Sequence, residues 1–297
     1  MQVATHDGSF HADDVFAVAA LRLRDPGLTI VRSRDAAVLG ACDVRVDVGS
    51  RADPATEDFD HHQRGGAGVR ENGIPYASFG LVWREHGAGL CGGEERIAAD
   101  VDRHLVQGID AIDVGVALTS SLVDDVRPMT VSDMVAGLNP AWDEPSGPAI
   151  LAARFEQAVG IAERIIERQI AAAGASARAA ELVREAIARA EDPRVIELER
   201  RVPWFEPVVA GAPDALYVLY PKSDGWGLQA VPRELGSFAN RKDLPAAWAG
   251  LDGPALAAVT GVPDATFCHA ARFIAAARTR EGAAELVRQA VAAPPAS

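Results

Sequence analysis

The first half of the chain alternates short apolar runs with segments of helical period. The segment Asp13–Arg24 has the spacing of a helix, and Asp25-Pro26-Gly27 would end it. This alternation predicts an α/β fold with a mostly parallel sheet in the N-terminal domain. Strands are expected at Gln2–Thr5, Thr29–Arg34 and Val44–Val48, and a short extended segment around Phe59. Further helices are expected at Tyr76–Gly87, Glu94–Gln107 and Asp113–Asp124.

A loop rich in Pro, Gly and Asn, with Asn139-Pro140 and Gly147-Pro148, is a candidate domain boundary. After it, apolar residues recur every three to four positions from about Ala149 to Ala190, which predicts one long amphipathic helix or two in succession. The repeat does not keep strict heptads, so a connecting helix packed on one domain is favoured over the seam of a homodimer. The homodimer remains the alternative.

The rest of the chain predicts a smaller α+β domain. The expected organisation is a catalytic domain at 1–148, a connecting helix at 149–191 and a substrate-binding domain at 192–297. The terminal Ala-Ala-Pro-Pro-Ala-Ser is expected to fray. Strands are expected at Val195–Glu199, Ala215–Tyr220, Gly227–Val231 and Thr266–Cys268, and helices at Pro245–Gly250, Pro254–Thr260 and Arg280–Ala292.

Composition narrows the possible partners and the compartment. The 297 residues carry a formal charge of −13, which argues against a broad surface for long duplex DNA, since that binding needs many Lys and Arg contacts. The N-terminus has no basic and apolar leader and no segment reaches transmembrane length, so we expect a cytoplasmic protein with no membrane contact. Cys42, Cys91 and Cys268 lack metal-site or disulfide spacing and are expected to be buried free thiols.

The histidines are concentrated near the N-terminus. Four of the seven, His6, His11, His61 and His62, fall in the first 62 residues, each with carboxylates nearby. Three of the expected extended segments lead into histidines or carboxylates: Gln2–Thr5 leads into His6, the run Val44–Val46 into Asp47, and the segment around Phe59 into Asp60-His61-His62. Ligand sites of open α/β sheets lie at the carboxyl ends of strands, so we expect one site at this edge.

Imidazole and carboxylate together suit Mn²⁺, Zn²⁺, Fe²⁺ or Co²⁺. We expect two ions, Mn²⁺ in the first place and Mg²⁺, Co²⁺, Zn²⁺ or Fe²⁺ as alternatives, which would assist hydrolysis of a phosphoester. Asp7 and Asp14 are better explained as caps of the first helix. His86 and His104 lie in helical patterns outside the site.

Four motifs in order resemble those of the melanocyte proliferating gene 1 family, a branch of the DHH phosphoesterases. Similar C-terminal signatures begin at Trp226, Asn240 and Phe267, so the resemblance covers essentially the whole chain. The four motifs are Thr5-His6-x-Gly8-x-Phe10-His11-x-Asp13, Val46-Asp47-Val48-Gly49, Asp60-His61-His62-Gln63 and Ile109-Asp110-Ala111-Ile112-Asp113-x-Gly115.

The resemblance implies a RecJ-like catalytic domain with two metal ions. One would be held by His6, His11 and Asp47, and the other by Asp13, Asp47, His61 and an aspartate of the fourth motif. Asp110 is favoured over Asp113 for this last ligand, although the two stand three residues apart and spacing cannot decide. His62 would face the scissile phosphate as a catalytic group, and Asp60 would orient a ligating histidine.

In the C-terminal domain the resemblance implies that Arg241 grips a phosphate, with Gln229, Arg233 and His269 as further substrate-binding residues. Trp226 and Trp248 are better explained by core packing. The chain departs from the family twice. Asp113-Val114-Gly115 replaces Asp-Asn-Gly, and the glycine-rich segment after His269 is filled by Ala271–Ala277, where Arg272 would compensate by its charge.

The expected function is a metal-dependent phosphodiesterase or 3′–5′ exonuclease acting on short single-stranded RNA, an oligonucleotide or a small nucleotide. The first alternative is a hydrolase of small phosphate esters, either pyrophosphatase-like or a nucleoside-phosphate phosphatase. The second is a metal-binding regulatory protein with marginal hydrolysis.

Overall fold

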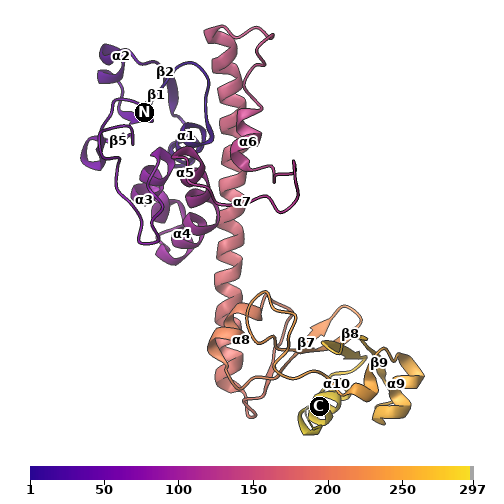
Figure 1. Ribbon diagram of the computed structural model, residues 1–297. Helices are drawn as coiled ribbons and strands as arrows, with labels where there is room; N and C mark the ends of the chain where they lie inside the picture. Colours follow the sequence, from indigo (N-terminus) through magenta and orange to yellow (C-terminus); the bar gives the residue numbers. More distant parts are fainter. Residues whose placement is uncertain (295–297) are drawn as a thin grey trace. The chain divides into compact units, whose positions relative to one another are not determined.

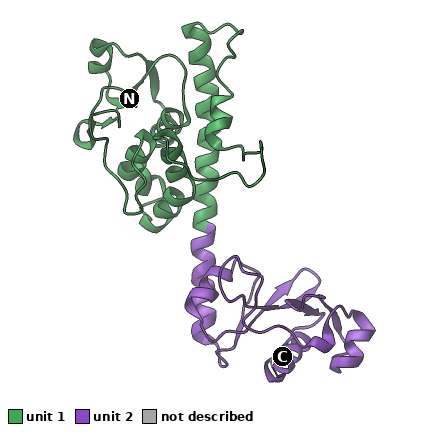
Figure 2. Ribbon diagram, viewed as in Figure 1, with its two compact units in different colours: residues 1–174 green, residues 175–297 purple. Residues whose placement is uncertain are grey.

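The protein forms two compact units in a computed structural model that describes residues 1–294. The units are Met1–Gly174 and Ala175–Ser297, and the boundary falls inside helix α7 (Pro148–Arg189) (Figure 2). The expected boundaries at 148 and 191 instead lie within two residues of the ends of this helix. The last residues of the tail that was expected to fray lie outside the described part of the chain.

The first unit contains a five-stranded sheet of order β2-β1-β3-β5-β4. Neighbouring strands are parallel except for β4, which runs antiparallel to β5, so the mostly parallel sheet is confirmed. In the register of β1 and β2, Thr5 pairs with Arg32. The strands are β1 (Gln2–Thr5), β2 (Thr29–Arg32), β3 (Val44–Val46), β4 (Ala52–Asp53) and β5 (Asp58–Phe59).

Helix α1 is the central helix of the first unit. It is buried from Ala12 to Leu21 and packs against α3 (Figure 1). In this contact the ring centroids of Phe16 and Phe79 lie 5.5 Å apart. The helical segments of this unit are α1 (Ala12–Arg24), α2 (Ala36–Gly40), the short 3-10 turn η1 (Pro54–Thr56), α3 (Ser78–Leu90), α4 (Glu95–Val101), the π-helical turn η2 (Asp102–Val106), α5 (Gln107–Asp113) and α6 (Val131–Ala136).

The prediction of a helix at Asp113–Asp124 is wrong. Helix α5 ends at Asp113, and Gly115 follows with φ of 78°, a conformation that stops a helix. Helix α6 was not predicted; it begins at a capping box in which Thr130 and Asp133 bond each other's backbone amides. This helix is little more than one turn long and its surrounding sequence is polar, so no helical periodicity indicates it.

Helix α7 is one continuous helix of 42 residues. Its first half buries Phe155, Val159 and Ile166 in the core of the first unit, and its last turns bury Val183 and Ala186 in a core of the second unit. The alternative of two successive helices is therefore excluded.

The second unit contains a sheet of order β6-β7-β8-β10-β9, in which only β6 and β7 pair in parallel. The smaller α+β domain is confirmed, although strand β10 and helix α8 were not predicted, and Pro245–Gly250 forms only a 3-10 turn. The elements are β6 (Val195–Glu197), α8 (Phe205–Gly211), β7 (Tyr217–Lys222), β8 (Gly225–Ala230), η3 (Ala246–Trp248), α9 (Gly253–Thr260), β9 (Ala265–Cys268), β10 (Ile274–Ala277) and α10 (Arg280–Ala292).

Two expectations about burial, those for the tryptophans and for the cysteines, are confirmed. Trp248 is buried in the core of the second unit and Trp226 packs against it. The three cysteines are buried and free. Among the described residues, no helix is both long and apolar enough to cross a membrane.

Candidate metal centre

Three neighbouring strands deliver side chains to one edge of the first sheet. His6 follows β1, Asp47 follows β3, and Asp60-His61-His62 follows β5. Asp47 has a φ of 54°, in the left-handed region that non-glycine residues rarely adopt. Residues held in such a conformation often occupy functional sites, where the surrounding structure maintains the strain.

The Asp47 carboxylate contacts all three histidines that follow the strand ends. One oxygen, Oδ2, lies 3.4 Å from His6 Nε2, and the other, Oδ1, lies 3.2 Å from His61 Nε2 and 3.3 Å from His62 Nδ1. The Ser78 hydroxyl also donates to Oδ1 at 3.2 Å. Burial by itself raises the pKa of the Asp47 carboxyl, but the neighbouring His6 and His61 imidazoles outweigh it and hold that pKa below its usual range.

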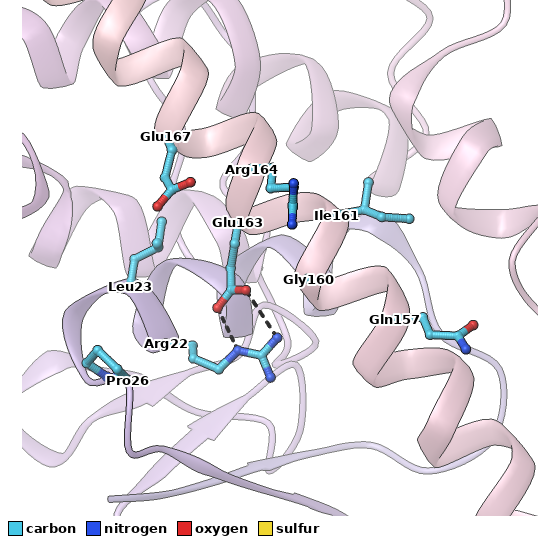
Figure 3. A pocket seen from close by; sticks show the side chains of 9 residues that line it. All are labelled: Arg22, Leu23, Pro26, Gln157, Gly160, Ile161, Glu163, Arg164 and Glu167. Carbon is cyan, nitrogen blue, oxygen red and sulfur yellow. Dashed lines mark hydrogen bonds and ion pairs between the residues drawn. The ribbon is translucent and has the colours of Figure 1, made fainter.

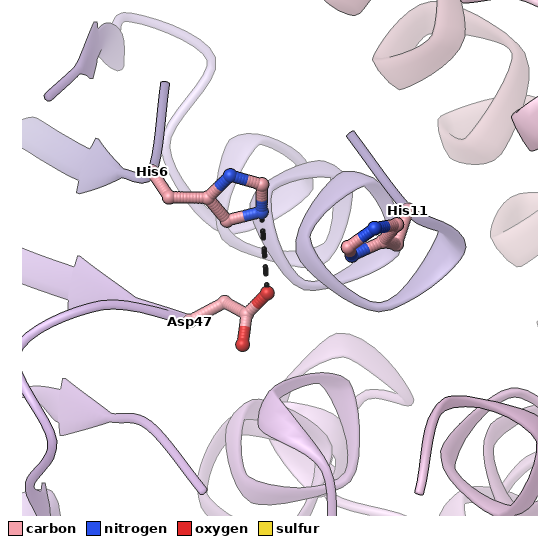
Figure 4. Close-up of side chains that lie close together, drawn as sticks. All are labelled: His6, His11 and Asp47. Carbon is pink, nitrogen blue, oxygen red and sulfur yellow. Dashed lines mark ion pairs between the residues drawn. The ribbon is translucent and has the colours of Figure 1, made fainter. Parts of the chain in front are cut away.

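His6, His11 and Asp47 form a first group whose ligand atoms lie within 4.8 Å of one another. Figure 4 shows the His6 imidazole directed at the Asp47 carboxylate and the His11 ring at the start of α1. His6 and Asp47 are buried and His11 is exposed, so the group opens to solvent on one side.

Asp13, His61 and Asp113 form a second group. His61 Nε2 lies 3.9 Å from Asp13 Oδ2 and 3.2 Å from Asp113 Oδ2. Asp13 is fully buried at the start of α1, and its two oxygens accept the backbone amides of Ser78 and Phe79 at 2.9 Å and 2.6 Å. The beginning of α3 therefore fixes this carboxylate with amides that point toward it.

Asp47 and His61 also form a third group with His62. The His62 side chain is 59% exposed, in contrast to His61 at 10%. Asp60 is buried and lies 2.7 Å from His62 Nδ1, while it also accepts the amides of Ser50 and His62. Asp60 thus orients the exposed His62.

The structure separates the two aspartates of the fourth motif. Asp113 joins His61, whereas Asp110 belongs to none of the three groups and is fully buried. Asp110 Oδ1 accepts the amide of Gly80 at 3.0 Å, and Asp110 Oδ2 lies 2.7 Å from Arg70 Nη1. Asp110 therefore joins α5 to α3 and to a buried arginine.

Asp14 does act as a cap, because its Oδ1 accepts the His11 amide at 2.8 Å. Its other oxygen lies 3.3 Å from His6 Nε2, so the residue also contributes charge to the centre. Burial raises the pKa of Asp14 to about 7. Asp7, by contrast, is exposed and pairs with Arg34.

The donor set of the three groups fits a divalent cation. His61 Nε2 is buried and makes no hydrogen bond within the described residues, although two carboxylate oxygens lie 3.2 Å from it. Asp14 Oδ2 is likewise buried without a hydrogen bond. Buried polar atoms normally have a hydrogen-bond partner. Buried atoms that lack one, next to converging carboxylates, therefore indicate a site that a cation could occupy.

Three residues that support the centre were not predicted: Arg70, Ser78 and Gly80. None belongs to a motif that carries chemistry, and each acts through a neighbour distant in sequence. A Cβ on Gly80 would lie 1.9 Å from Asp110 Oδ2, so only glycine fits there. The start of a helix next to an acidic cluster was the only signal that could have pointed to them.

The candidate substrate-binding residues lie in the second unit. Arg241 donates to the carbonyl oxygens of Val209, Ala212 and Ala215, which gives it a structural role. Arg272 has a φ of 58° and pairs with Asp243 at 3.0 Å. The remaining three make local contacts: Gln229 accepts from the Tyr220 hydroxyl, exposed Arg233 donates to Asn240 O, and exposed His269 packs its ring on Phe273.

A surface hollow between α1 and α7 lies apart from these groups. Its walls include Arg22 and Glu163, which form a bidentate ion pair (Figure 3). None of the residues in the three candidate metal-ligand groups lines it. The hollow therefore adds nothing to the candidate centre.

The mostly parallel sheet and the His/Asp cluster at its carboxyl edge define an α/β protein with a candidate metal centre. The chain belongs to the MYG1 family, because the family model MYG1_exonuc, described as an uncharacterised protein family (UPF0160), matches residues 2–291. The MYG1 exonuclease of Bos taurus is 34% identical over 99% of this chain and 86% of its own length. The MYG1 exonuclease of Homo sapiens is 34% identical over 98% and 86%, and a MYG1 protein of Schizosaccharomyces pombe is 32% identical over 98% and 97%.

Proposed function

We propose that this protein is a metal-dependent phosphoesterase, most specifically a phosphodiesterase or 3′–5′ exonuclease of short single-stranded RNA or small nucleotides. The observation that carries the proposal is the convergence of three His/Asp groups on Asp47 and His61 at one sheet edge. The relatives named MYG1 exonuclease support a nuclease over other hydrolases. The charge of −13 favours short substrates over long duplexes.

We assign one ion to His6, His11 and Asp47, and a second to Asp13, Asp47, His61 and Asp113. Asp47 offers both of its oxygens and would be shared. Asp113 replaces Asp110 in this assignment, because Asp110 is already held by Arg70 and Gly80. Mn²⁺ is the proposed metal, since it accepts imidazole and carboxylate ligands together.

Divalent cations at these positions would polarise a phosphoryl oxygen and lower the pKa of a water that attacks phosphorus. The protein's own contribution includes His62, whose exposed ring can approach the substrate. Asp60 keeps Nδ1 of that ring engaged, so Nε2 is free to stabilise charge on the phosphate or to protonate the leaving oxygen.

The test uses bis-p-nitrophenyl phosphate, a labelled short RNA and pyrophosphate, each with Mn²⁺ and with EDTA. We expect turnover of the first two with Mn²⁺ only. His61→Ala should lower kcat/KM at least about a hundredfold, which is the usual effect of removing one group from a preorganised catalytic centre. Pyrophosphate cleavage without diester cleavage would instead favour the small-phosphate alternative.

His104→Ala is the matched control, since this histidine is on the surface with a side chain 61% exposed and belongs to no group. It should keep wild-type turnover. If metal-loaded protein cleaves neither diester, and His61→Ala equals wild type, the enzymatic proposal fails and a regulatory metal-binding role becomes the better account.

A further inference from the structure

The end of β2 lines a cavity of about 450 Å³ within the first unit. Ile30 and Arg32 form one wall, and the turn Asp7-Gly8 forms another. This turn lies between the two metal-centre histidines His6 and His11. The remaining wall comes from Ser146 and the start of α7 (Pro148, Leu151, Ala152, Phe155 and Glu156). The cavity thus borders the candidate metal centre through one loop.

Arg32 is the cation of this cavity, and most of its donors have no acceptor. Nη2 donates to Gly8 O at 2.8 Å. Nε is buried and makes no hydrogen bond within residues 1–294, and Nη1 has no protein acceptor there either. The guanidinium carbon lies 4.6 Å from the centre of the Phe155 ring and 5.7 Å from that of Phe10. The aromatic rings hold the guanidinium in place while its other N–H groups remain available.

The carboxylates of the cavity are already paired with other arginines. Asp7 pairs with Arg34, and Glu156 lies 2.6 Å from Arg22 Nη1. Burial lowers the pKa of Arg32, and the attraction of Asp14 and Asp7 only partly offsets this. A half-buried cation that is not fully compensated attracts an anion.

The rest of the wall is largely apolar, with Ile30, Leu151, Pro148 and the buried Phe155. A volume of about 450 Å³ is within the usual range for sites of small organic ligands, so the cavity is larger than a free phosphate needs. An anionic group joined to a flat, partly apolar body would match both the charge and the wall.

We propose that this cavity binds a nucleoside monophosphate unit, with its phosphate on Arg32 and its nucleoside along Ile30 and Leu151. The choice of ligand rests on the proposed function, because a nuclease produces such a unit beside its metal centre. The cavity would then hold the nucleotide at the end of a short substrate. It would thereby favour oligonucleotides over simple diesters.

The test measures equilibrium binding of AMP to the full-length protein in EDTA by calorimetry, without metal or turnover. Arg32→Gln should weaken AMP binding about 10- to 100-fold, the range expected when a charged hydrogen-bonding group is lost. Ala152→Trp, at an exposed lining position, should weaken it by blocking the cavity. Arg103→Gln removes the same charge from a side chain 61% exposed outside the cavity and should bind like wild type.

Adenosine and inorganic phosphate separate the two parts of the ligand, and each should bind more weakly than AMP. Absence of AMP binding to wild type, or equal binding by Arg32→Gln, would overturn the proposal. Phosphate binding as tight as AMP would also overturn it, since the apolar wall would then contribute nothing. AMP binding that depends on Arg32 in a protein without phosphoesterase activity would support the cavity while the proposed function fails.

Discussion

Arg70 Nη1 lies 2.7 Å from Asp110 Oδ2, and both side chains are almost completely buried, at 6% and 0% exposure. Arg70 Nη2 also donates to Asp102 Oδ1 at 2.8 Å. Asp113 lies three residues after Asp110 on α5. The Arg70–Asp110 ion pair therefore fixes the helix that carries the proposed ligand Asp113. One aspartate of the fourth motif positions the helix, and the other belongs to a group that could hold a metal ion.

This division of roles predicts losses of different size for two matched substitutions. Asp113→Asn should weaken Mn²⁺ binding by at least about tenfold, because it removes a charged ligand. Asp110→Asn should weaken it less, because Asp110 does not reach the metal groups. Calorimetric titration of the two folded variants with Mn²⁺ checks this. A larger loss in Asp110→Asn than in Asp113→Asn would return the ligand role to Asp110.

Arg70→Met should lower the free energy of unfolding by about 3–5 kcal/mol, because it leaves the buried Asp110 carboxylate without its partner. Urea denaturation measures the change. Arg103→Met is the control on an exposed arginine and should change stability by no more than about 0.5 kcal/mol. Similar small changes in both variants would show that the Arg70 pair does not stabilise the fold.

Gly80→Ala should destabilise the protein by about 1–3 kcal/mol, because the new methyl group would displace Asp110 and Arg70, whose Nη2 would lie 2.7 Å away. Gly89→Ala on the same helix has open space and should stabilise by up to about 1 kcal/mol. Thermal unfolding of both variants compares them. A neutral Gly80→Ala would mean that the approach of Asp110 to α3 is looser than the structure shows.

The metal-free protein should lose stability as pH rises from 6.5 to about 10. Burial lowers the pKa of His61, but Asp113 and Asp47 outweigh it and raise the pKa from 6.5 to about 10. A pKa raised by folding adds stability that is fully present below pH 6.5 and is lost as the pH passes the folded value. Urea midpoints in EDTA across this range test the prediction, and His61→Gln should show a flatter profile. Identical profiles would contradict it.

The strand ends of the site could be predicted because they depend on local sequence. Apolar runs define β1 and β3, and the parallel topology then brings His6 and Asp47 to one edge. His61 and His62 could be placed at the same edge, because they follow the short extended segment around Phe59. The convergence of these side chains at one sheet edge could therefore be predicted from the sequence.

The choice between Asp110 and Asp113 could not be made from sequence. Residues three apart share one helix face, so periodicity treats them alike. What distinguishes them is Arg70, forty positions away from Asp110, together with the close approach of Gly80. These are tertiary contacts, and no local pattern encodes them.

Arg241 illustrates the same limit in the second unit. An arginine in a polar signature resembles a phosphate ligand, yet its guanidinium donates to four backbone carbonyls of the segment around α8 and the turn before β7. Those carbonyls come from about thirty residues earlier in the chain. The sequence near Arg241 gives no sign of them.

Anomalous X-ray scattering from crystals of the protein grown with Mn²⁺ tests the central claim most directly. The account predicts two manganese peaks in the cluster, one contacting His6, His11 and Asp47, and one contacting Asp13, His61 and Asp113, with Asp47 shared. Peaks only elsewhere, or none at this sheet edge under saturating Mn²⁺, would contradict it.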